Sequence, residues 1–296
     1  MKKDFITIKD LTKKEIEDIF KLTGQLKKHK AKFNRVLTGK TLALIFQKPS
    51  NRTRVSFEVG MCQLGGNSIY LAPHEIDLGV RESIRDAAMT LSRYVDAIAL
   101  RTFKHDDILE MAKYSAVPVI NGLSDIEHPC QAMADVYTIK EKFGKLKGIT
   151  LAYVGDGNNV CSSLLRACAK CDLRLNVAAP KGYEPDNSIL KETSANLFYN
   201  SSEAVKGADV IYTDVWASMG QEKEAEIRKK AFKDFQVNRE LVKSAKKDCL
   251  IMHCLPAHRD EEITADVIDG ANSIVFDQAE NRLHVQKAIL IKLLER

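Results

Sequence analysis

The run Thr41-Leu-Ala-Leu-Ile-Phe46 and the segment that follows it, Lys48-Pro-Ser-Asn-Arg-Thr-Arg54, decide the fold. After Thr41 the first run is apolar throughout, which is typical of a buried strand. The stretch from Val55 to Leu64 contains no helix breaker except Gly60 and predicts a helix. The polar segment 48–54 therefore lies where a buried strand turns into a helix.

This junction has the properties of an anion site. The first N–H groups of a helix have no partner within the helix, and the helix dipole favours negative charge there. Ser50 and Thr53 add hydroxyl donors, and Arg52 and Arg54 add guanidinium groups that fit a phosphate. In the alternative interpretation, Ser50 is an ordinary N-cap and the arginines are solvated.

Strands and helices alternate along the rest of the chain. We expect strands at residues 41–46, 67–71, 96–101, 117–120, 149–154, 173–179, 208–213, 249–252 and 273–276. We expect helices near residues 13–28, 54–64, 83–94, 107–114, 131–143, 160–170, 221–230 and 280–294, and loop or weak helix at 72–83 and 186–206. This alternation predicts an α/β fold with helices on both faces of parallel sheets. The Gly144-Lys-Leu-Lys-Gly148 segment is typical of a joint, so we expect two domains, at residues 1–143 and 147–276.

Further polar residues follow the strands of the first domain. Arg101 ends one expected strand, and His128 and Gln131 flank Pro129 at the start of the next helix. Ligands of open parallel sheets bind beyond the carboxyl ends of the strands. These residues and the 48–54 segment share that edge. The sequence therefore favours one ligand site over the alternative that each polar cluster merely caps a helix or is solvated.

The second domain begins with a strand and the turn Gly155-Asp-Gly157-Asn-Asn159, which suggests a dinucleotide site. The third glycine of that fingerprint is replaced by serine, and the next strand ends in Ala-Pro instead of an acidic residue. A nicotinamide cofactor is therefore not predicted. Asn159 either binds a ligand or caps the following helix.

Composition narrows the class of protein. The chain has 296 residues, a net charge of +5 and interspersed acidic and basic residues, so we expect neither nucleic-acid binding nor a membrane span. The N-terminus has no apolar signal core, and we expect a cytoplasmic protein. The seven cysteines predict reduced thiols, and the isolated Cys168–Cys171 pair is not expected to hold zinc.

Four motifs taken together closely resemble the aspartate/ornithine carbamoyltransferase family. They are Ser50-Asn-Arg-Thr-Arg54, His128-Pro-Cys-Gln131, Asp214-Val-Trp-Ala-Ser-Met-Gly220 and His253-Cys-Leu-Pro256. The resemblance runs from about residue 5 to the C-terminus, and the Ser-Met-Gly segment points to ornithine as the acceptor. It implies transfer of a carbamoyl group to the side-chain amine of ornithine, giving citrulline and phosphate, without a metal or organic cofactor.

The resemblance also implies site residues and an assembly. Carbamoyl phosphate would bind to Ser50, Asn51, Arg52, Thr53, Asp77, Arg101, His128, Gln131, Cys254, Leu255 and Arg282. Ornithine would bind to Asn159, Asp214, Ser218 and Met219. Residues 1–143, with a C-terminal helix at 277–296 that returns to them, would bind carbamoyl phosphate, and residues 147–276 would bind ornithine. The family forms homotrimers whose sites lie at subunit interfaces.

Within this reaction we expect Arg101, His128 and Cys254 to be catalytic. Arg101 and His128 are donors suited to the carbonyl oxygen. Cys254, close to an acid such as Asp214, is a candidate for taking the proton of the ornithine amine. The alternative for Cys254 is a small buried residue with a packing role.

Two positions depart from the family pattern. Asn51 stands where the family usually has threonine, and its amide can still donate a hydrogen bond. Asp77 stands where a neighbouring subunit usually offers glutamine or histidine. A carboxylate repels a dianion, so we expect Asp77 either to turn away or to be offset by Arg81.

Three other functions are weighed against this one. A related transferase could use another amine, such as putrescine or N-acetylornithine, but Asp214 and the Ser218-Met219 pair favour a free amino acid. An NAD(P)-dependent oxidoreductase is disfavoured by the incomplete glycine fingerprint. A non-catalytic paralogue is disfavoured because Arg101, His128 and Cys254 are all present.

Overall fold

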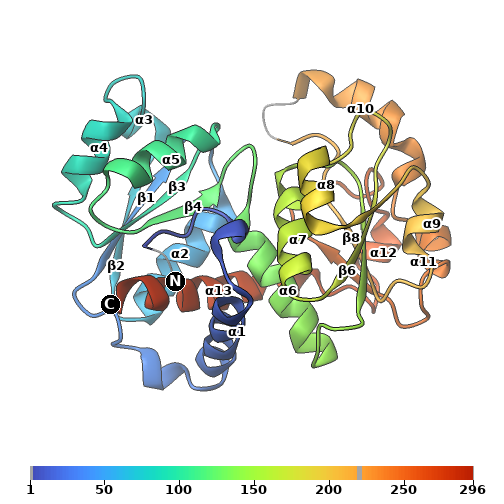
Figure 1. The fold of residues 1–296 in the computed structure, drawn as a ribbon, viewed down its shortest axis with the longest axis horizontal. Helices are drawn as coiled ribbons and strands as arrows, with labels where there is room; N and C mark the ends of the chain where they lie inside the picture. Colours follow the sequence, from blue (N-terminus) through green and yellow to red (C-terminus); the bar gives the residue numbers. More distant parts are fainter. Residues whose placement is uncertain (1–2, 219–221, 296) are drawn as a thin grey trace. The chain divides into compact units, whose positions relative to one another are not determined.

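The structure is a computed structural model, and it describes residues 3–218 and 222–295. The chain divides into two compact units, whose elements are labelled in Figure 1. The first unit contains the chain up to Tyr137 and from Glu280 onward, and the second contains Thr138–Ala279. Each unit has one parallel sheet with flanking helices, which confirms the expected fold class.

The first sheet has four parallel strands in the order β2-β1-β3-β4. They are β1 Thr41–Phe46, β2 Asn67–Leu71, β3 Ala97–Arg101 and β4 Val119–Leu123. The central strands β1 and β3 are almost wholly buried, as expected where helices cover both faces of a sheet. Because Phe46 pairs with Arg101, these two strands end side by side.

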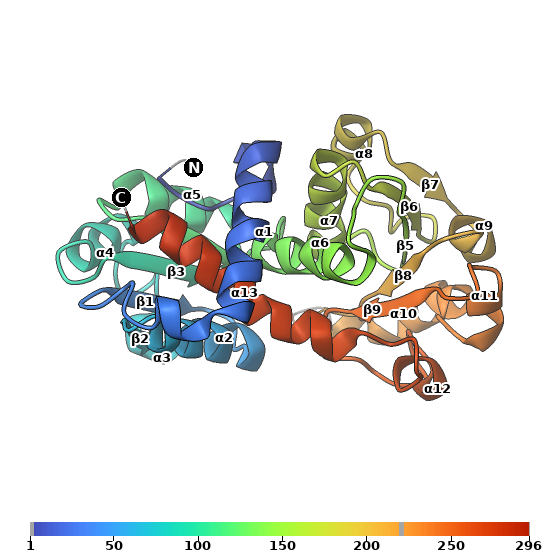
Figure 2. The ribbon, with the colours of Figure 1, turned by 90° about the horizontal axis from the view of Figure 1, so that it is seen from below.

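Helices of the first unit connect and cover its sheet. They are α1 Lys13–Lys28, α2 Asn51–Gln63, α3 Pro73–Ile76, α4 Ile84–Leu91 and α5 His105–Tyr114, with the 3₁₀ segments Ile8–Asp10 and Lys30–Phe33. The first unit also includes α6 Pro129–Phe143 up to Tyr137 and α13 Val275–Leu294 from Glu280 onward. The C-terminal helix α13 contacts α1 and α2 (Figure 2), since Lys27 donates a hydrogen bond to Asn281 and Lys287 donates one to Gln63. From Glu280 onward this helix thus belongs with the first unit, as expected.

The second sheet has five parallel strands in the order β7-β6-β5-β8-β9. They are β5 Thr150–Val154, β6 Arg174–Ala178, β7 Asn196–Phe198, β8 Val210–Thr213 and β9 Leu250–His253. The helices are α7 Asn159–Lys170, α8 Asn187–Thr193, α9 Ser201–Val205, α10 Ala225–Phe232, α11 Arg239–Lys243 and α12 Ala265–Ile268, with 3₁₀ segments at Glu222–Glu224 and Lys233–Phe235. Trp216 is buried against Phe232, with ring centroids 5.9 Å apart, so its role is packing.

The expected strand at residues 273–276 is wrong. Ser273 forms only an isolated bridge with Ile251, and α13 begins at Val275. A short apolar run does not distinguish a strand from the first turn of a buried helix. Here the amide of Gln278 donates to the carbonyl of Ile274, so the run continues into the helix that was expected only from residue 280.

Two regions without a clear pattern contain short elements. The 72–83 loop includes the single-turn helix α3, and the 186–206 stretch contains α8, β7 and α9. Strand β7 has three residues that are exposed or half-buried, so it produces no alternation of apolar and polar residues.

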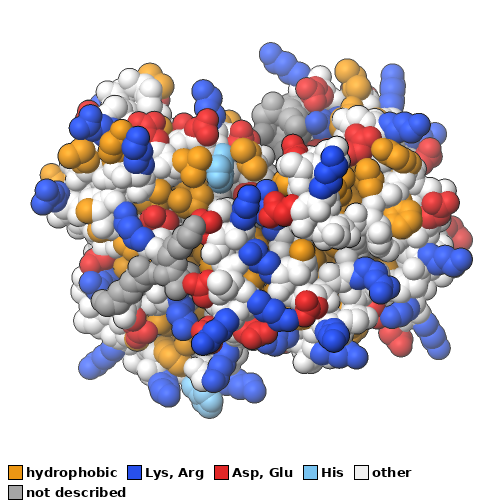
Figure 3. Space-filling view, in the orientation of Figure 1, with side chains coloured by type: hydrophobic (Ala, Val, Ile, Leu, Met, Phe, Trp, Pro, Cys, Tyr) orange, Lys and Arg blue, Asp and Glu red, His pale blue; other side chains and the backbone are white. Residues whose placement is uncertain are grey.

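Acidic and basic side chains share one face of the molecule (Figure 3). Acidic and basic residues are interspersed on the face shown in Figure 3, as the sequence indicated. Among the residues that the structure describes, no helix combines the length and the apolar character needed to cross a bilayer.

Candidate active site

The segment predicted to bind an anion forms the first turn of α2. Ser50 is the N-cap, and its hydroxyl accepts a hydrogen bond from the Thr53 amide at 3.3 Å. The helix begins at Asn51, earlier than expected, so Asn51, Arg52 and Thr53 form its first turn, whose N–H groups lie outside the i→i−4 ladder of the helix. Capping by Ser50 and anion binding by this turn are therefore compatible.

Arg54 has other partners. Its Nε donates to Glu58 at 2.9 Å, and its guanidinium lies 3.7 Å from the centre of the Tyr70 ring. The suggestion that Arg54 binds phosphate is therefore not supported by its position.

Arg282 connects three helices of the first unit. Its Nη2 donates to Thr53 Oγ1 at 2.9 Å, and its Nη1 donates to Gln131 Oε1 at 2.6 Å. Gln131 in turn donates through Nε2 to Asp135 at 2.8 Å, and all four side chains are buried. The chain thus brings α2, α6 and α13 together through one guanidinium, whose partners lie as far as 229 residues away in the sequence.

Arg101 and His128 are two further buried polar residues of the same unit, and of the two only Arg101 is charged. Arg101 ends β3, His128 precedes α6, and each is only 5% exposed. Burial, followed by the charges of Arg282 and Arg52, lowers the pKa of Arg101 to about 10. Among the described residues Arg101 Nε has no hydrogen-bond partner. A buried guanidinium beside two others favours a bound anion.

His128 is held neutral by its surroundings. Burial lowers its pKa well below the ordinary value, and the charges of Arg282, Arg101 and Arg52 lower it further. A neutral imidazole can donate one N–H to a carbonyl oxygen without adding charge. His128 therefore suits the carbonyl group of a ligand whose anionic part is bound by the arginines.

The depressed pKa of His128 predicts a pH-dependent stability. The unfolded chain takes up a proton near pH 6.5 and the folded chain does not, so stability is present above this pH and is lost as the pH falls below it. We expect His128→Gln to lessen the loss of unfolding free energy between pH 7 and pH 5 by about 2 kcal/mol. Urea titrations of both proteins at the two pH values test this, and an equal loss in both would contradict it.

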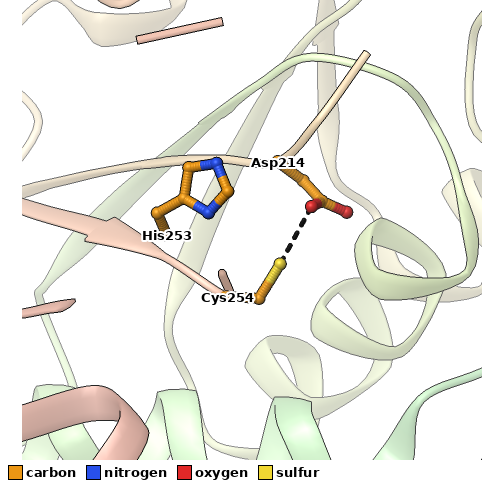
Figure 4. A group of neighbouring side chains, drawn as sticks. All are labelled: Asp214, His253 and Cys254. Carbon is orange, nitrogen blue, oxygen red and sulfur yellow. Dashed lines mark hydrogen bonds between the residues drawn. The ribbon is translucent and has the colours of Figure 1, made fainter. Parts of the chain in front are cut away.

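In the second unit Cys254 and Asp214 form a pair (Figure 4). Asp214 follows β8 and Cys254 follows β9, and the two strands are neighbours in which Thr213 pairs with His253. The Cys254 thiol donates to Asp214 Oδ1 at 2.9 Å. Asp214 is 5% exposed, and its Oδ2 accepts a hydrogen bond from Asn158 Nδ2 at 2.8 Å. A thiol against an oriented carboxylate is an arrangement suited to proton transfer.

The two asparagines after Gly157 have different roles. Asn158 is the N-cap of α7, and its Oδ1 accepts from the amides of Val160 and Cys161 at 2.9 and 3.1 Å. The capping role left open for Asn159 thus belongs to Asn158, and Asn159 is the first helical residue, with a half-buried side chain. Sequence reasoning did not identify Asn158 as the residue that orients Asp214.

His253 and Glu262 support the loop that carries Cys254. His253 Nδ1 accepts from the Leu255 amide at 2.9 Å, so its Nε2–H donates to Glu262 Oε1 at 3.0 Å. Both side chains are fully buried. Leu255 has a φ of 58°, which is rare for a branched residue, and it is followed by a cis peptide bond to Pro256. The pair was not predicted as part of the site, although His253 adjoins the cysteine.

Asp214, His253 and Cys254 also have ligand-type atoms within 4.8 Å of one another. Both ring nitrogens of His253 already have partners, Leu255 and Glu262. The group therefore favours proton chemistry over metal binding.

The remaining predicted residues lie at the surface or outside the described residues. Asp77 is exposed at the end of α3, and the Arg81 guanidinium contacts the Glu75 carbonyl at 3.4 Å instead of Asp77. Ser218 is half-buried at the end of the segment after β8. Met219 lies outside the described residues.

Comparison with known proteins identifies the class. Residues 3–141 match the aspartate/ornithine carbamoyltransferase carbamoyl-P binding domain, and residues 147–293 match the Asp/Orn binding domain of the same family. The chain therefore belongs to the aspartate/ornithine carbamoyltransferase family, as its four motifs indicated.

Several individual members of this family are similar to the chain over nearly its full length. The chain is 56% identical to an ornithine carbamoyltransferase of Thermococcus kodakarensis, over 97% of this chain and 95% of the relative. It is 52% identical to that of Bacillus subtilis, over 99% and 94%. The solved structure of ornithine carbamoyltransferase from Pyrococcus furiosus superposes with a TM-score of 0.95 at 54% identity, covering 99% of this chain and 97% of the other. That from Thermus thermophilus has a TM-score of 0.92 at 45% identity, covering 99% of each chain.

Proposed function

We propose that this chain transfers the carbamoyl group of carbamoyl phosphate to the side-chain amine of L-ornithine, giving L-citrulline and phosphate. The observation that carries this proposal is the buried group of Arg101, His128 and Arg282 beside the first turn of α2. A ligand that has both a dianionic phosphate and an adjoining carbonyl group could contact every residue of this group. Relatives more than 50% identical, named ornithine carbamoyltransferases, support ornithine as the acceptor.

Carbamoyl phosphate binding is assigned to the first unit. The N–H groups of the α2 first turn, with Ser50, Asn51 and Arg52, would receive the phosphate oxygens. Thr53 accepts a hydrogen bond from Arg282, so its own hydroxyl proton can be donated to the ligand. Arg101 and neutral His128 would donate to the carbonyl oxygen and stabilise the negative charge that grows on it during attack.

The amine must lose a proton to react. An amine of this kind has a pKa of about 10, so at neutral pH most of it is protonated. We assign the removal of this proton to the Cys254–Asp214 pair: the thiol passes its own proton to Asp214 Oδ1, and the thiolate so formed accepts the amine proton. The amine nitrogen then forms a bond to the carbonyl carbon, and the bond from that carbon to the phosphate oxygen breaks. Phosphate leaves with the electron pair of the broken bond.

Ornithine binding is assigned to the second unit. Asn159, Asp214, Ser218 and Met219 would hold its amino-acid end. Asn158 fixes the Asp214 carboxylate, so it acts as a positioning residue for this part of the site. Residues 254 and 255 would complete the contacts to the carbamoyl group.

We further propose a cytoplasmic homotrimer whose sites lie at subunit interfaces. The family resemblance supports this assembly. Asp77 of one subunit would lie near the carbamoyl phosphate of its neighbour, and its exposure on α3 is compatible with such a contact.

Formation of the carbamoylated product, which is citrulline when ornithine is the acceptor, tests the function. Carbamoyl phosphate is supplied with L-ornithine, putrescine, N-acetylornithine or L-aspartate in parallel reactions. We expect turnover with L-ornithine alone. Turnover with another amine instead would show that the 214–219 segment has been misinterpreted, and no turnover with any acceptor would refute the proposal.

Asp77→Gln tests the subunit contact. Removing a negative charge near a dianion should tighten carbamoyl phosphate binding by about threefold to tenfold. Calorimetric titration of carbamoyl phosphate measures this change. Asp106→Asn, which removes an exposed carboxylate of α5, serves as the control and should have no effect. Unchanged binding in Asp77→Gln would indicate that this residue points away from the ligand.

A further inference from the structure

A ligand-sized cavity lies in the first unit, at the other end of α2 from the candidate active site. Its volume is about 360 Å³, and it is lined by Leu26 at the end of α1, by residues 30, 31, 33 and 34, by the end of α2 and by Lys287 of α13. Helix α2 has 13 residues, so the Ser50–Thr53 turn and this cavity lie about 18 Å apart along the helix axis. The cavity is therefore distinct from the site described above.

Lys287 places a buried cation in the wall of this cavity. It is only 2% exposed, and its Nζ donates a hydrogen bond to Gln63 Oε1 at 2.7 Å. Within residues 3–218 and 222–295, no carboxylate forms an ion pair with it. Burial, followed by the charge of Lys30, lowers the pKa of Lys287 to about 8. Since buried ammonium groups are normally paired, an anion in the cavity would stabilise this lysine.

The rest of the wall defines what kind of anion fits. Leu26, Phe33 and Leu64 make much of the wall apolar, and no acidic residue is among the described residues that line it. Lys30 and Lys287 supply the positive charge. A highly hydrated dianion would require more donors than these, whereas a carboxylate with a short hydrocarbon chain matches both the charge and the apolar surface.

We propose that this cavity is an effector site for a small apolar carboxylate. Helices α2 and α13 connect it to the candidate active site, because both helices take part in each. At one end Arg282 donates to Thr53 at 2.9 Å, and at the other Lys287 donates to Gln63. A Cβ added to Gly60 would lie 3.3 Å from Lys287 Cγ, so the two helices are in contact between these ends. A carboxylate that draws Lys287 away from Gln63 changes the packing of the helix that carries Arg282.

Alkylation of Cys62 reports on occupancy. Cys62 is exposed and lines the cavity, whereas Cys254 is half-buried and the other thiols are buried. The full-length protein is treated with iodoacetamide, and the alkylation rate of Cys62 is followed by peptide mass spectrometry. The probe is hexanoate, with the uncharged hexanamide and with inorganic phosphate in parallel reactions. An eight-atom ligand is expected to bind with a dissociation constant of about 1 mM.

We expect saturating hexanoate to slow the alkylation of Cys62 by about fivefold or more, with little effect of hexanamide or phosphate. Lys287→Met should remove the protection, and Lys30→Met, at an exposed position, should weaken it severalfold. Lys247→Met removes an exposed lysine of the second unit and should leave the protection intact. Absence of protection, or equal protection in Lys287→Met, would overturn the site. Equal protection by hexanamide or by phosphate would overturn the assignment to an organic carboxylate.

The effector role, which rests on the proposed function, is tested by reciprocity. Coupling between two sites acts equally in both directions. Saturating carbamoyl phosphate should therefore change the hexanoate concentration that gives half-protection by about threefold or more. Calorimetry measures carbamoyl phosphate binding separately. An unchanged hexanoate midpoint while carbamoyl phosphate binds would overturn the effector role, whereas failure of carbamoyl phosphate to bind would overturn the proposed function.

Discussion

Replacement of Arg282 by methionine is expected to raise the KM for carbamoyl phosphate by about 100-fold or more. The guanidinium donates to Thr53 and Gln131 and contributes positive charge beside Arg101. Charge-assisted hydrogen bonds contribute about 1.5–3 kcal/mol each, so the loss of one or two accounts for a change of this size. Initial rates of citrulline formation at varied carbamoyl phosphate and saturating ornithine give the KM.

Two variants separate charge from geometry in this experiment. Arg282→Lys keeps the charge, but an ammonium cannot match the two-pronged contact, so we expect an intermediate loss of about tenfold. Arg239→Met removes an arginine from an exposed pair with Asp266 and should leave both kinetic constants unchanged. A KM within about fivefold of the original in a folded Arg282→Met protein would disprove the role of this residue, because a surface-charge effect of about 1 kcal/mol corresponds to about fivefold.

Substitution of Cys254 by serine should lower kcat by about 100-fold to 1000-fold, the range expected for loss of a general base. A hydroxyl beside Asp214 is much less acidic than a thiol, so it does not give up its proton to the carboxylate and no anion forms to accept the amine proton. The KM for carbamoyl phosphate should change little, because its phosphate contacts belong to the first unit. This split between kcat and KM distinguishes proton transfer from a packing role, which would leave kcat nearly intact.

The pH profile and a second cysteine provide controls. The loss in Cys254→Ser should diminish as the pH approaches the pKa of the amine, about 10, where the base is no longer needed. Cys171→Ser, at the buried end of α7, removes a thiol away from Asp214 and should retain the original kcat. A deficit in Cys254→Ser that is constant with pH would contradict the proton role.

The sequence predicts the strands and helices that carry the site residues better than it predicts the contacts between those residues. The run at 41–46 and the breaker-free stretch after it locate Ser50–Thr53 at a strand-to-helix junction, because hydrophobic pattern and helix ends are local properties. Arg282 has no local signal of this kind. Its partner Thr53 is 229 residues away, and only the family resemblance brought the two into one site.

Two contacts that the sequence did not reveal and one wrong prediction have physical causes. Sequence does not report which of two adjacent asparagines adopts the extended conformation of an N-cap, and this choice assigns the Asp214 contact to Asn158. The His253–Glu262 pair spans a nine-residue separation across an irregular loop, for which no periodicity exists. The 274–276 run is apolar and short, so tertiary packing decided between strand and helix.

The pairing of β8 with β9 makes strand alignment part of the chemistry. Thr213 lies opposite His253, and the thiol and the carboxylate each stand one residue beyond this pair. A slip of one residue in either strand would turn one of the two side chains to the opposite face of the sheet. The pairing of the two strands, from Val210 opposite Leu250 onward, thus determines the distance between the thiol and the carboxylate. Buried residues of these strands therefore set the thiol–carboxylate distance on which the proposed proton transfer depends.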